Sequence, residues 1–165
     1  MLNRRQFVGA ASALCAATLL QEQITCEAKE SEEFTKLISR QVGITTSSLS
    51  RHLVANPGKG QFSLLQLPQI LRDELEMKVI DLNTSSVASY EPAYLEKVRE
   101  AARDAGCVLT NLKLNQRGLD MNSRDEDVRR KALSEYKRSI EAASKLGCRW
   151  ARPVSYTHLT LPTSG

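Results

Sequence analysis

Two segments of the chain alternate polar and apolar side chains, and the polar ones are of types that bind polar ligands. The polar positions carry one carboxylate, one ammonium and three amide groups: Asp81, Asn83, Asn111, Lys113 and Asn115. The apolar positions between them are Ile80, Leu82, Leu112 and Leu114. Because successive side chains of a strand point to opposite faces, each segment is predicted to form a strand with one polar face. Carboxylate and amide groups hydrogen-bond to hydroxyls, so these faces are candidate binding surfaces.

Asn83 and Asn115 come last in these two segments, and we expect both to contact the hydroxyl groups of a substrate. The alternative is that each asparagine caps the loop that follows its strand. Lys113 has an alternative of its own, because it could form a structural ion pair with Asp81 inside the fold. The residue types alone leave these alternatives open.

An alternation of strand and helix patterns must position these side chains. Strands are expected at 43–49, 78–83, 107–115 and 148–152, and helices at 63–76, 91–105 and 125–146. Pro68 fits its helix only within the first turn, and Gly106 and Gly147 are expected to end the other two. Strands that alternate with helices predict a parallel sheet, in a TIM barrel or a doubly wound fold. No glycine-rich phosphate fingerprint follows a strand, which disfavours the dinucleotide-binding version.

Several other side chains are expected to have structural roles. The helix at 125–146 should bury an apolar face made of Val128, Ala132, Leu133, Tyr136, Ile140 and Ala143. Its start should be capped or solvated by Asp120, Asp125 and Glu126. Packing roles are expected for Tyr90, Tyr94 and Trp150, and for Cys107 and Cys148 as buried small apolar groups.

The composition is that of an ordinary globular protein. The 165 residues are 25% charged and 5% aromatic, with a net charge of +4. A modest charge with few aromatic residues and no long basic run argues against nucleic acid as a partner. Outside the last thirteen residues His52 is the only histidine, so neither Cys107 nor Cys148 has a histidine near it in sequence to suggest a metal site.

Residues 1–28 are expected to be a twin-arginine-type signal peptide, and residues 29–42 a linker. Arg4 and Arg5 are followed by Phe7 and Val8 and then by a short, alanine-rich apolar run. The alternatives are a signal for the general secretory pathway or an uncleaved anchor. The expected partner is therefore the twin-arginine export machinery, and the expected location is periplasmic or otherwise extracytoplasmic.

The last residues, 153–165, are expected not to be native. Residues 153–163 resemble the in-frame translation of a transposase-based sequencing adapter. On this interpretation the natural sequence is interrupted after Arg152, and His158 belongs to no active site. The alternative is a genuine threonine-rich strand and turn.

Residues 43–152 resemble the first half of a xylose isomerase-like TIM barrel, the superfamily of sugar phosphate isomerases and epimerases. The resemblance lies in three stretches: 75–83, 94–107 and 125–152. The last of them is the most telling, with Arg129, Lys137, Ile140 and Leu146-Gly147-Cys148 in the family's pattern before its fourth strand. The resemblance implies an α/β fold, a partial (β/α)8 barrel with about the first four strands.

The same resemblance implies a metal-dependent sugar or sugar phosphate isomerase or epimerase as the parent protein. Family members bind a divalent metal through Glu, Asp, His and Glu residues of later strands, so no metal or catalytic residue is assigned here. Substrate contacts are expected for Asn83 and Asn115, and Arg152 is expected to face a sugar or a phosphate. The chain itself is expected to be inactive. The alternatives for the parent are a non-catalytic carbohydrate-binding barrel and an endonuclease-like member of the same fold.

Overall fold

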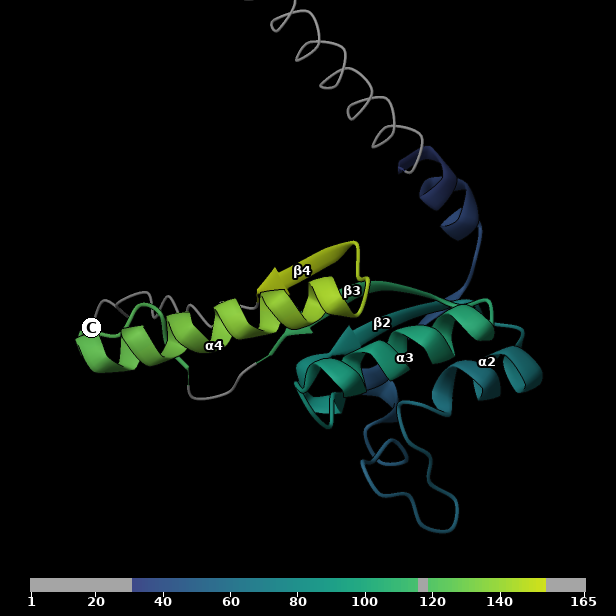
Figure 1. The fold of residues 1–165 in the computed structure, drawn as a ribbon, viewed down its shortest axis with the longest axis horizontal. Helices are drawn as coiled ribbons and strands as arrows, with labels where there is room; N and C mark the ends of the chain where they lie inside the picture. Colours follow the sequence, from purple (N-terminus) through teal and green to yellow (C-terminus); the bar gives the residue numbers. More distant parts are fainter. Residues whose placement is uncertain (1–30, 116–118, 154–165) are drawn as a thin grey trace, which may run out of the picture. The chain divides into compact units, whose positions relative to one another are not determined.

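The computed structural model describes residues 31–115 and 119–153. The chain divides into two compact units, Met1–Arg40 and Gln41–Gly165. In the first unit, residues 31–38 are helical. The second unit contains the sheet and its helices, which are shown in Figure 1. No helix among the described residues has the length and apolar character needed to cross a membrane.

Four parallel strands form the sheet of the second unit. They are β1 (Gly43–Thr45), β2 (Val79–Asn83), β3 (Val108–Leu114) and β4 (Trp150–Pro153), and their order in the sheet is the order of the chain. Each strand pairs in parallel with the next, so β1 and β4 are the two edges among the described residues. The predicted parallel α/β arrangement is confirmed.

Three helices connect these strands and pack on one face of the sheet. They are α2 (Leu67–Leu75), α3 (Pro92–Asp104) and α4 (Glu126–Lys145), and α3 and α4 run in front of the strands in Figure 1. Pro68 lies in the first turn of α2, and Pro92 begins α3, where a proline leaves no backbone hydrogen bond unmade. The prediction for Pro68 is confirmed.

The ends of α3 and α4 are the same motif. Gly106 and Gly147 have positive φ angles of 66° and 74°, which glycine adopts without strain. After α3, the Gly106 N–H donates to Arg103 O and the Cys107 N–H to Ala102 O. The two donors that follow α4 bond three and five residues back in the same way, at Ser144 O and Ala143 O. This pair of hydrogen bonds is the Schellman motif, and in both places a cysteine follows the glycine, directly before β3 and two residues before β4.

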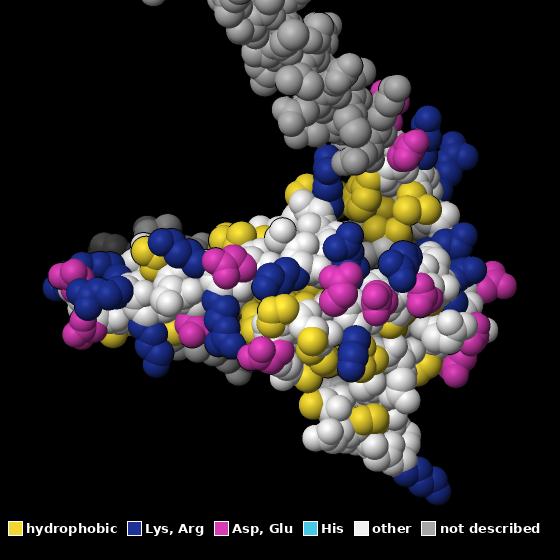
Figure 2. Space-filling model, viewed as in Figure 1, with side chains coloured by type: hydrophobic (Ala, Val, Ile, Leu, Met, Phe, Trp, Pro, Cys, Tyr) yellow, Lys and Arg dark blue, Asp and Glu magenta, His cyan; other side chains and the backbone are white. Residues whose placement is uncertain are grey.

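The apolar core lies between the sheet and the helices. Its fully buried members include Ile80, Leu82, Leu112 and Leu114 from the strands and Leu67, Leu71, Leu95, Val98 and Leu146 from the helices and their ends. Tyr90 and Tyr94 are partly buried and pack against this core, as predicted. Cys107 is buried and Cys148 partly buried, and both thiols are free. On the face shown in Figure 2, Lys and Arg side chains lie among Asp and Glu side chains over α3 and α4.

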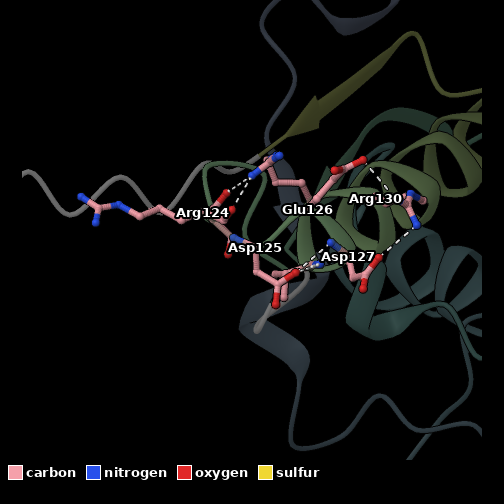
Figure 3. Close-up of polar contacts among 8 residues, drawn as sticks. Arg124, Asp125, Glu126, Asp127 and Arg130 are labelled. Carbon is pink, nitrogen blue, oxygen red and sulfur yellow. Dashed lines mark hydrogen bonds and ion pairs between the residues drawn. The ribbon is translucent and has the colours of Figure 1, made fainter.

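The start of α4 is fixed by its own acidic residues. The Asp125 carboxylate accepts hydrogen bonds from the backbone N–H groups of Asp127 and Val128, at 2.8 and 3.4 Å. Figure 3 shows Arg130 reaching both Glu126 and Asp127, each at 3.0 Å. The capping role predicted for Asp125 is confirmed, and Glu126 contributes through this exposed ion pair.

Three predictions about these elements were wrong in detail. The first strand ends at Thr45, because residues Thr46–Leu49 turn into a 3-10 helix, η1. The first helix of the unit begins at Leu67 rather than Ser63, since Gln66 Oε1 accepts from the Ser63 N–H and Oγ in a turn before it.

The third error concerns the buried face of α4. Leu133 and Ile140 are each 49% exposed, whereas Ala132, Tyr136 and Ala143 are buried as predicted. Compared with the predicted face, the buried face of α4 is turned toward α3. It therefore includes Ser139 and Ala142, which were not in the predicted set. Ser139 Oγ donates to Glu135 O of the preceding turn, which satisfies this buried hydroxyl.

Candidate functional site

The sheet face opposite the helices carries polar side chains in two rows. The first row follows from the pairing of Asp81 with Asn111 and of Asn111 with Trp150. The second row, closer to the carboxyl ends of the strands, follows from the pairing of Asn83 with Lys113 and of Lys113 with Arg152. Paired residues of neighbouring strands share a face. The polar faces predicted for the two segments therefore lie on one common face of the sheet.

A bulge makes this alignment possible. Ile80 pairs with Leu109, but the next residue of β2, Asp81, pairs with Asn111, so Thr110 is the extra residue in β3. Thr110 Oγ1 donates to Ile80 O at 3.3 Å. A one-residue shift in register moves every later side chain to the other face. Without this bulge, Asn111 and Lys113 would lie on the face opposite Asp81 and Asn83.

Asp81 and Asn111 bond to each other across the two strands. Asn111 Nδ2 donates to Asp81 Oδ1 at 3.0 Å. The other polar atom of the amide, Asn111 Oδ1, is buried and has no hydrogen-bond partner among the described residues. A buried carbonyl oxygen without a donor costs about 1–3 kcal/mol, so this oxygen marks a place where a ligand donor would be stabilised.

The ion pair considered for Lys113 and Asp81 is not formed. No ion pair joins them within residues 31–115 and 119–153, and the partner of Asp81 is Asn111. The reason is the register of the two strands, which places Lys113 opposite Asn83 and Asn111 opposite Asp81. Lys113 is half-buried in the second row.

Asn83 is buried and forms a dense local hydrogen-bond network. Its Nδ2 donates to Ser47 Oγ at 2.9 Å, and its Oδ1 accepts from the N–H and the hydroxyl of Ser85, each at 3.0 Å. Its backbone N–H donates to Thr46 Oγ1 at 2.9 Å. Asn83 thus caps the short 3-10 helix η2 (Thr84–Ser86) and ties it to η1, as its structural alternative predicted. Its contact with a substrate stays a prediction.

The other two predicted contact residues lie at the same end of the sheet. The Asn115 N–H follows β3 and donates to Thr84 Oγ1 at 3.2 Å, which joins this loop to η2. Arg152 lies in β4, exposed to solvent. The structure thus brings Asn83 and Arg152 into one row, with Lys113 between them, and substrate binding by the three predicted residues is a matter for experiment.

A pocket of about 530 Å³ opens on this face of the sheet. It is lined by Asp81, Thr110, Asn111, Trp150, Ala151, Arg152 and Pro153. Trp150 is 52% exposed and lines this pocket, so its predicted role in packing is wrong. Sequence reasoning missed Trp150, and it placed Asn111 on the polar face without singling it out as a contact residue. The signal for Trp150 was its position two residues before Arg152, which places both on one face of a strand.

Cys148 lies next to this polar face. Burial, together with the negative charge of Asp81, raises the pKa of the Cys148 thiol to about 12. Burial also raises the pKa of Cys107, although the positive charges of Arg72 and Lys78 act against it. Both thiols therefore stay protonated at neutral pH, and neither has the lowered pKa of a nucleophilic cysteine.

The described residues do not fit a divalent metal. Within residues 31–115 and 119–153, no three His, Cys, Asp or Glu side chains gather in a group that could hold an ion. The row nearest the carboxyl ends of the strands contains an amide and two cations, which is the opposite of the anionic oxygen set that such metals prefer.

Comparison with known proteins gives similarity in fold. No family model matches the chain, and no curated protein matches it. The solved structure of a D-psicose 3-epimerase in the presence of D-fructose aligns with a TM-score of 0.56 and 17% identity, over 76% of this chain and 40% of the epimerase. A xylose isomerase domain protein from Planctomyces limnophilus aligns with a TM-score of 0.43 and 13% identity, over 66% of this chain and 38% of that one.

The match spans less than half of the epimerase chain. Four parallel strands, three helices on one face and a polar opposite face agree with the wall of such a barrel. The described part of the chain has the fold of a partial TIM barrel, similar over this span to the D-psicose 3-epimerase structure.

Proposed function

We propose that the chain is part of a barrel protein that binds a sugar at the carboxyl ends of its strands and isomerises or epimerises it. The observation that carries the proposal is the pocket on the polar sheet face, where Asn111 Oδ1, which has no partner among the described residues, lies beside Asp81 and Trp150. The pocket extends from this row to Arg152 and Pro153, toward the carboxyl end of β4, and barrel enzymes build their sites at that end of the strands. The similarity in fold to an epimerase supports the same proposal.

Each side chain of this pocket suits a sugar. Asn111 Oδ1 would accept a hydrogen bond from a sugar hydroxyl, which removes the energetic cost of its unpaired state. Trp150 offers a large apolar ring on which the C–H face of a sugar packs. The Arg152 guanidinium donates to ring or hydroxyl oxygens. These groups bind and orient the ligand.

Proton transfer is not assigned to any residue described here. The divalent metal and the acid and base carboxylates expected from the family resemblance would come from other strands of the parent barrel. The chain alone is therefore proposed to bind a sugar weakly without converting it. Export through the twin-arginine pathway also stays a prediction, because residues 1–28 lie outside the described residues.

The test is a titration of the full 165-residue chain with D-fructose, followed by backbone amide shifts in NMR. We expect saturable shifts at Asn111 and Trp150. An Asn111→Ala variant should weaken binding about fivefold, the value of one hydrogen bond, and the exposed-turn variant Asn122→Ala should not. Absence of saturable shifts, or equal affinity in Asn111→Ala, would contradict the proposed site.

A parallel incubation with D-fructose and Mn²⁺, analysed by chromatography for D-psicose, tests the expected inactivity. Turnover by the chain alone would show that the catalytic groups are present in it. Sequencing of the gene past the codon for Arg152 tests the expectation about residues 153–165, and it distinguishes an enzyme from a non-catalytic binding protein. Glu, Asp, His and Glu at successive strand ends are expected for an enzyme, and their absence indicates a carbohydrate-binding barrel.

A further inference from the structure

Two cations lie opposite each other on neighbouring strands of the polar face. Lys113 of β3 pairs in register with Arg152 of β4, in the row closest to the carboxyl ends of the strands. Neighbouring strands are separated by about 4.8 Å, and like charges directly opposite each other destabilise a sheet. This arrangement therefore opposes folding unless an anion lies close to both side chains.

Among the described residues no protein anion fills this role. None of the ion pairs within residues 31–115 and 119–153 includes Lys113 or Arg152. Asp81 is the carboxylate on the same face, but it lies in the other row and accepts from Asn111. Asn83, on the other side of Lys113, is buried and holds η1 and η2 together.

On the outer surface, arginine side chains are paired with carboxylates of the same helix. Arg130 of α4 contacts both Glu126 and Asp127, as Figure 3 shows. Arg99 and Arg138 each lie within 4.0 Å of a glutamate three residues earlier in the same helix. Lys113 and Arg152 differ from these arginines, because the residue opposite each of them on the neighbouring strand is a cation and not a carboxylate.

We propose that Lys113 and Arg152 form an oxyanion site, which binds a phosphate or carboxylate group of a ligand. The planar Arg152 guanidinium can donate two hydrogen bonds to one oxyanion, and the Lys113 ammonium adds a compact charge beside it. Arg152 also lines the 530 Å³ pocket, so the oxyanion would lie next to the Asn111 and Trp150 subsite. That the anion is carried by a sugar rests on the proposed function, whereas the oxyanion site itself does not.

Inorganic phosphate tests the oxyanion site alone. Titration of the full chain with phosphate at constant ionic strength should shift the backbone amides of Lys113 and Arg152. Lys113→Gln and Arg152→Gln should each weaken phosphate binding about tenfold, the value of one charge-assisted hydrogen bond, and Lys113→Arg should retain it. The matched control is Arg149→Gln, an exposed arginine just before β4, which should change affinity less than twofold.

Thermal unfolding gives a second readout for the same variants. Without phosphate, Lys113→Gln should unfold at a higher temperature than the native chain, since it removes the repulsion. At the same phosphate concentration, phosphate should raise the unfolding temperature of the native chain more than that of Lys113→Gln. Equal losses of phosphate affinity in Arg149→Gln and Arg152→Gln, or the absence of shifts at either cation, would overturn the oxyanion site.

Two further ligands identify the source of the anion. D-Fructose 6-phosphate binding more tightly than D-fructose indicates a sugar phosphate, and gluconate binding more tightly indicates a sugar acid. Binding of phosphate without D-fructose would support the oxyanion site and contradict the proposed sugar function. Binding of D-fructose without phosphate would do the reverse.

Discussion

Asn111 Nδ2 donates to Asp81 Oδ1 at 3.0 Å, and this bond joins β3 to β2 on the polar face of the sheet. The bond leaves Asn111 Oδ1 buried and unpartnered among the described residues. The Asn111 amide thus holds the Asp81 carboxylate through its Nδ2 and offers its Oδ1 to the pocket as a hydrogen-bond acceptor. The pair is the most direct link between the fold and the candidate site.

Replacing the donor of this pair by an acceptor should destabilise the sheet. Asn111→Asp places a second carboxylate against Asp81, and we expect the free energy of unfolding to fall by about 1 kcal/mol or more. Urea unfolding followed by circular dichroism measures the change. Asn56→Asp, in an exposed loop, is the control and should be neutral. An Asn111→Asp variant as stable as the native chain would show that the bond contributes nothing.

Asn83 should prove necessary for stability. Asn83→Ala removes three side-chain hydrogen bonds and leaves Ser47 and Ser85 without their shared partner. We expect a loss of about 2–3 kcal/mol, typical of a broken buried network. Urea unfolding of Asn83→Ala and of Asn122→Ala, in an exposed turn, makes the comparison. If Asn83→Ala kept full stability but lost D-fructose binding, the substrate role predicted from sequence would replace the capping role.

The Cys148 thiol should react slowly and with an unusual pH dependence. Its pKa of about 12 means that the thiolate appears only at high pH. Between pH 7 and 10 the rate of alkylation by iodoacetamide should rise about tenfold per pH unit without levelling off. In the chain unfolded by urea, the rate should level off near the ordinary thiol pKa of about 8.5. Mass spectrometry of the Cys148 peptide measures both rates.

Asp81→Asn provides the matched variant for Cys148. Removing the negative charge should lower the thiol pKa and speed up alkylation, but only in part, because burial is the larger cause of the shift. A levelling of the native rate below pH 9 would show that the thiol is not protected. Equal rates in the native chain and Asp81→Asn would show that the carboxylate does not act on it.

The exposed apolar positions of α4 should promote self-association of the chain. Leu133 and Ile140 are seven residues apart on one helix face, and β4 beside them is a sheet edge among the described residues. Open edges and apolar faces attract further chains. The double variant Leu133→Lys with Ile140→Lys should reduce aggregation in light scattering. Leu75→Lys, at an equally exposed position of α2, should have a smaller effect.

Most elements of the fold could be predicted because their signals are local. β2, α3, β3 and α4 begin and end within one or two residues of the predicted limits. Glycines at 106 and 147 mark two helix ends by conformation alone, and alternation of polar and apolar residues marks β3. These signals depend only on residues that are close together in the sequence, so they can be recognised without knowledge of the fold.

The errors concern relationships between elements. Nothing in the residues around Thr110 indicates a bulge, yet the bulge places Asn111 opposite Asp81 and on the same face of the sheet. In the same way, the exposure of Leu133 depends on which side of α4 faces α3. Trp150 was assigned to packing because tryptophan is usually buried, and its exposure follows only from its row in the sheet.

The placement of the apolar core on one side of the sheet has a consequence for synthesis on the ribosome. The core draws on residues from Leu53 to Leu146, all from the described strands, helices and loops between them. A nascent chain can therefore complete this burial as soon as α4 has emerged, before any later strand is made. The part of the polar rows that β2 and β3 contribute would then be in place early, and β4 would add Trp150 and Arg152 to a sheet whose β2–β3 register is already fixed.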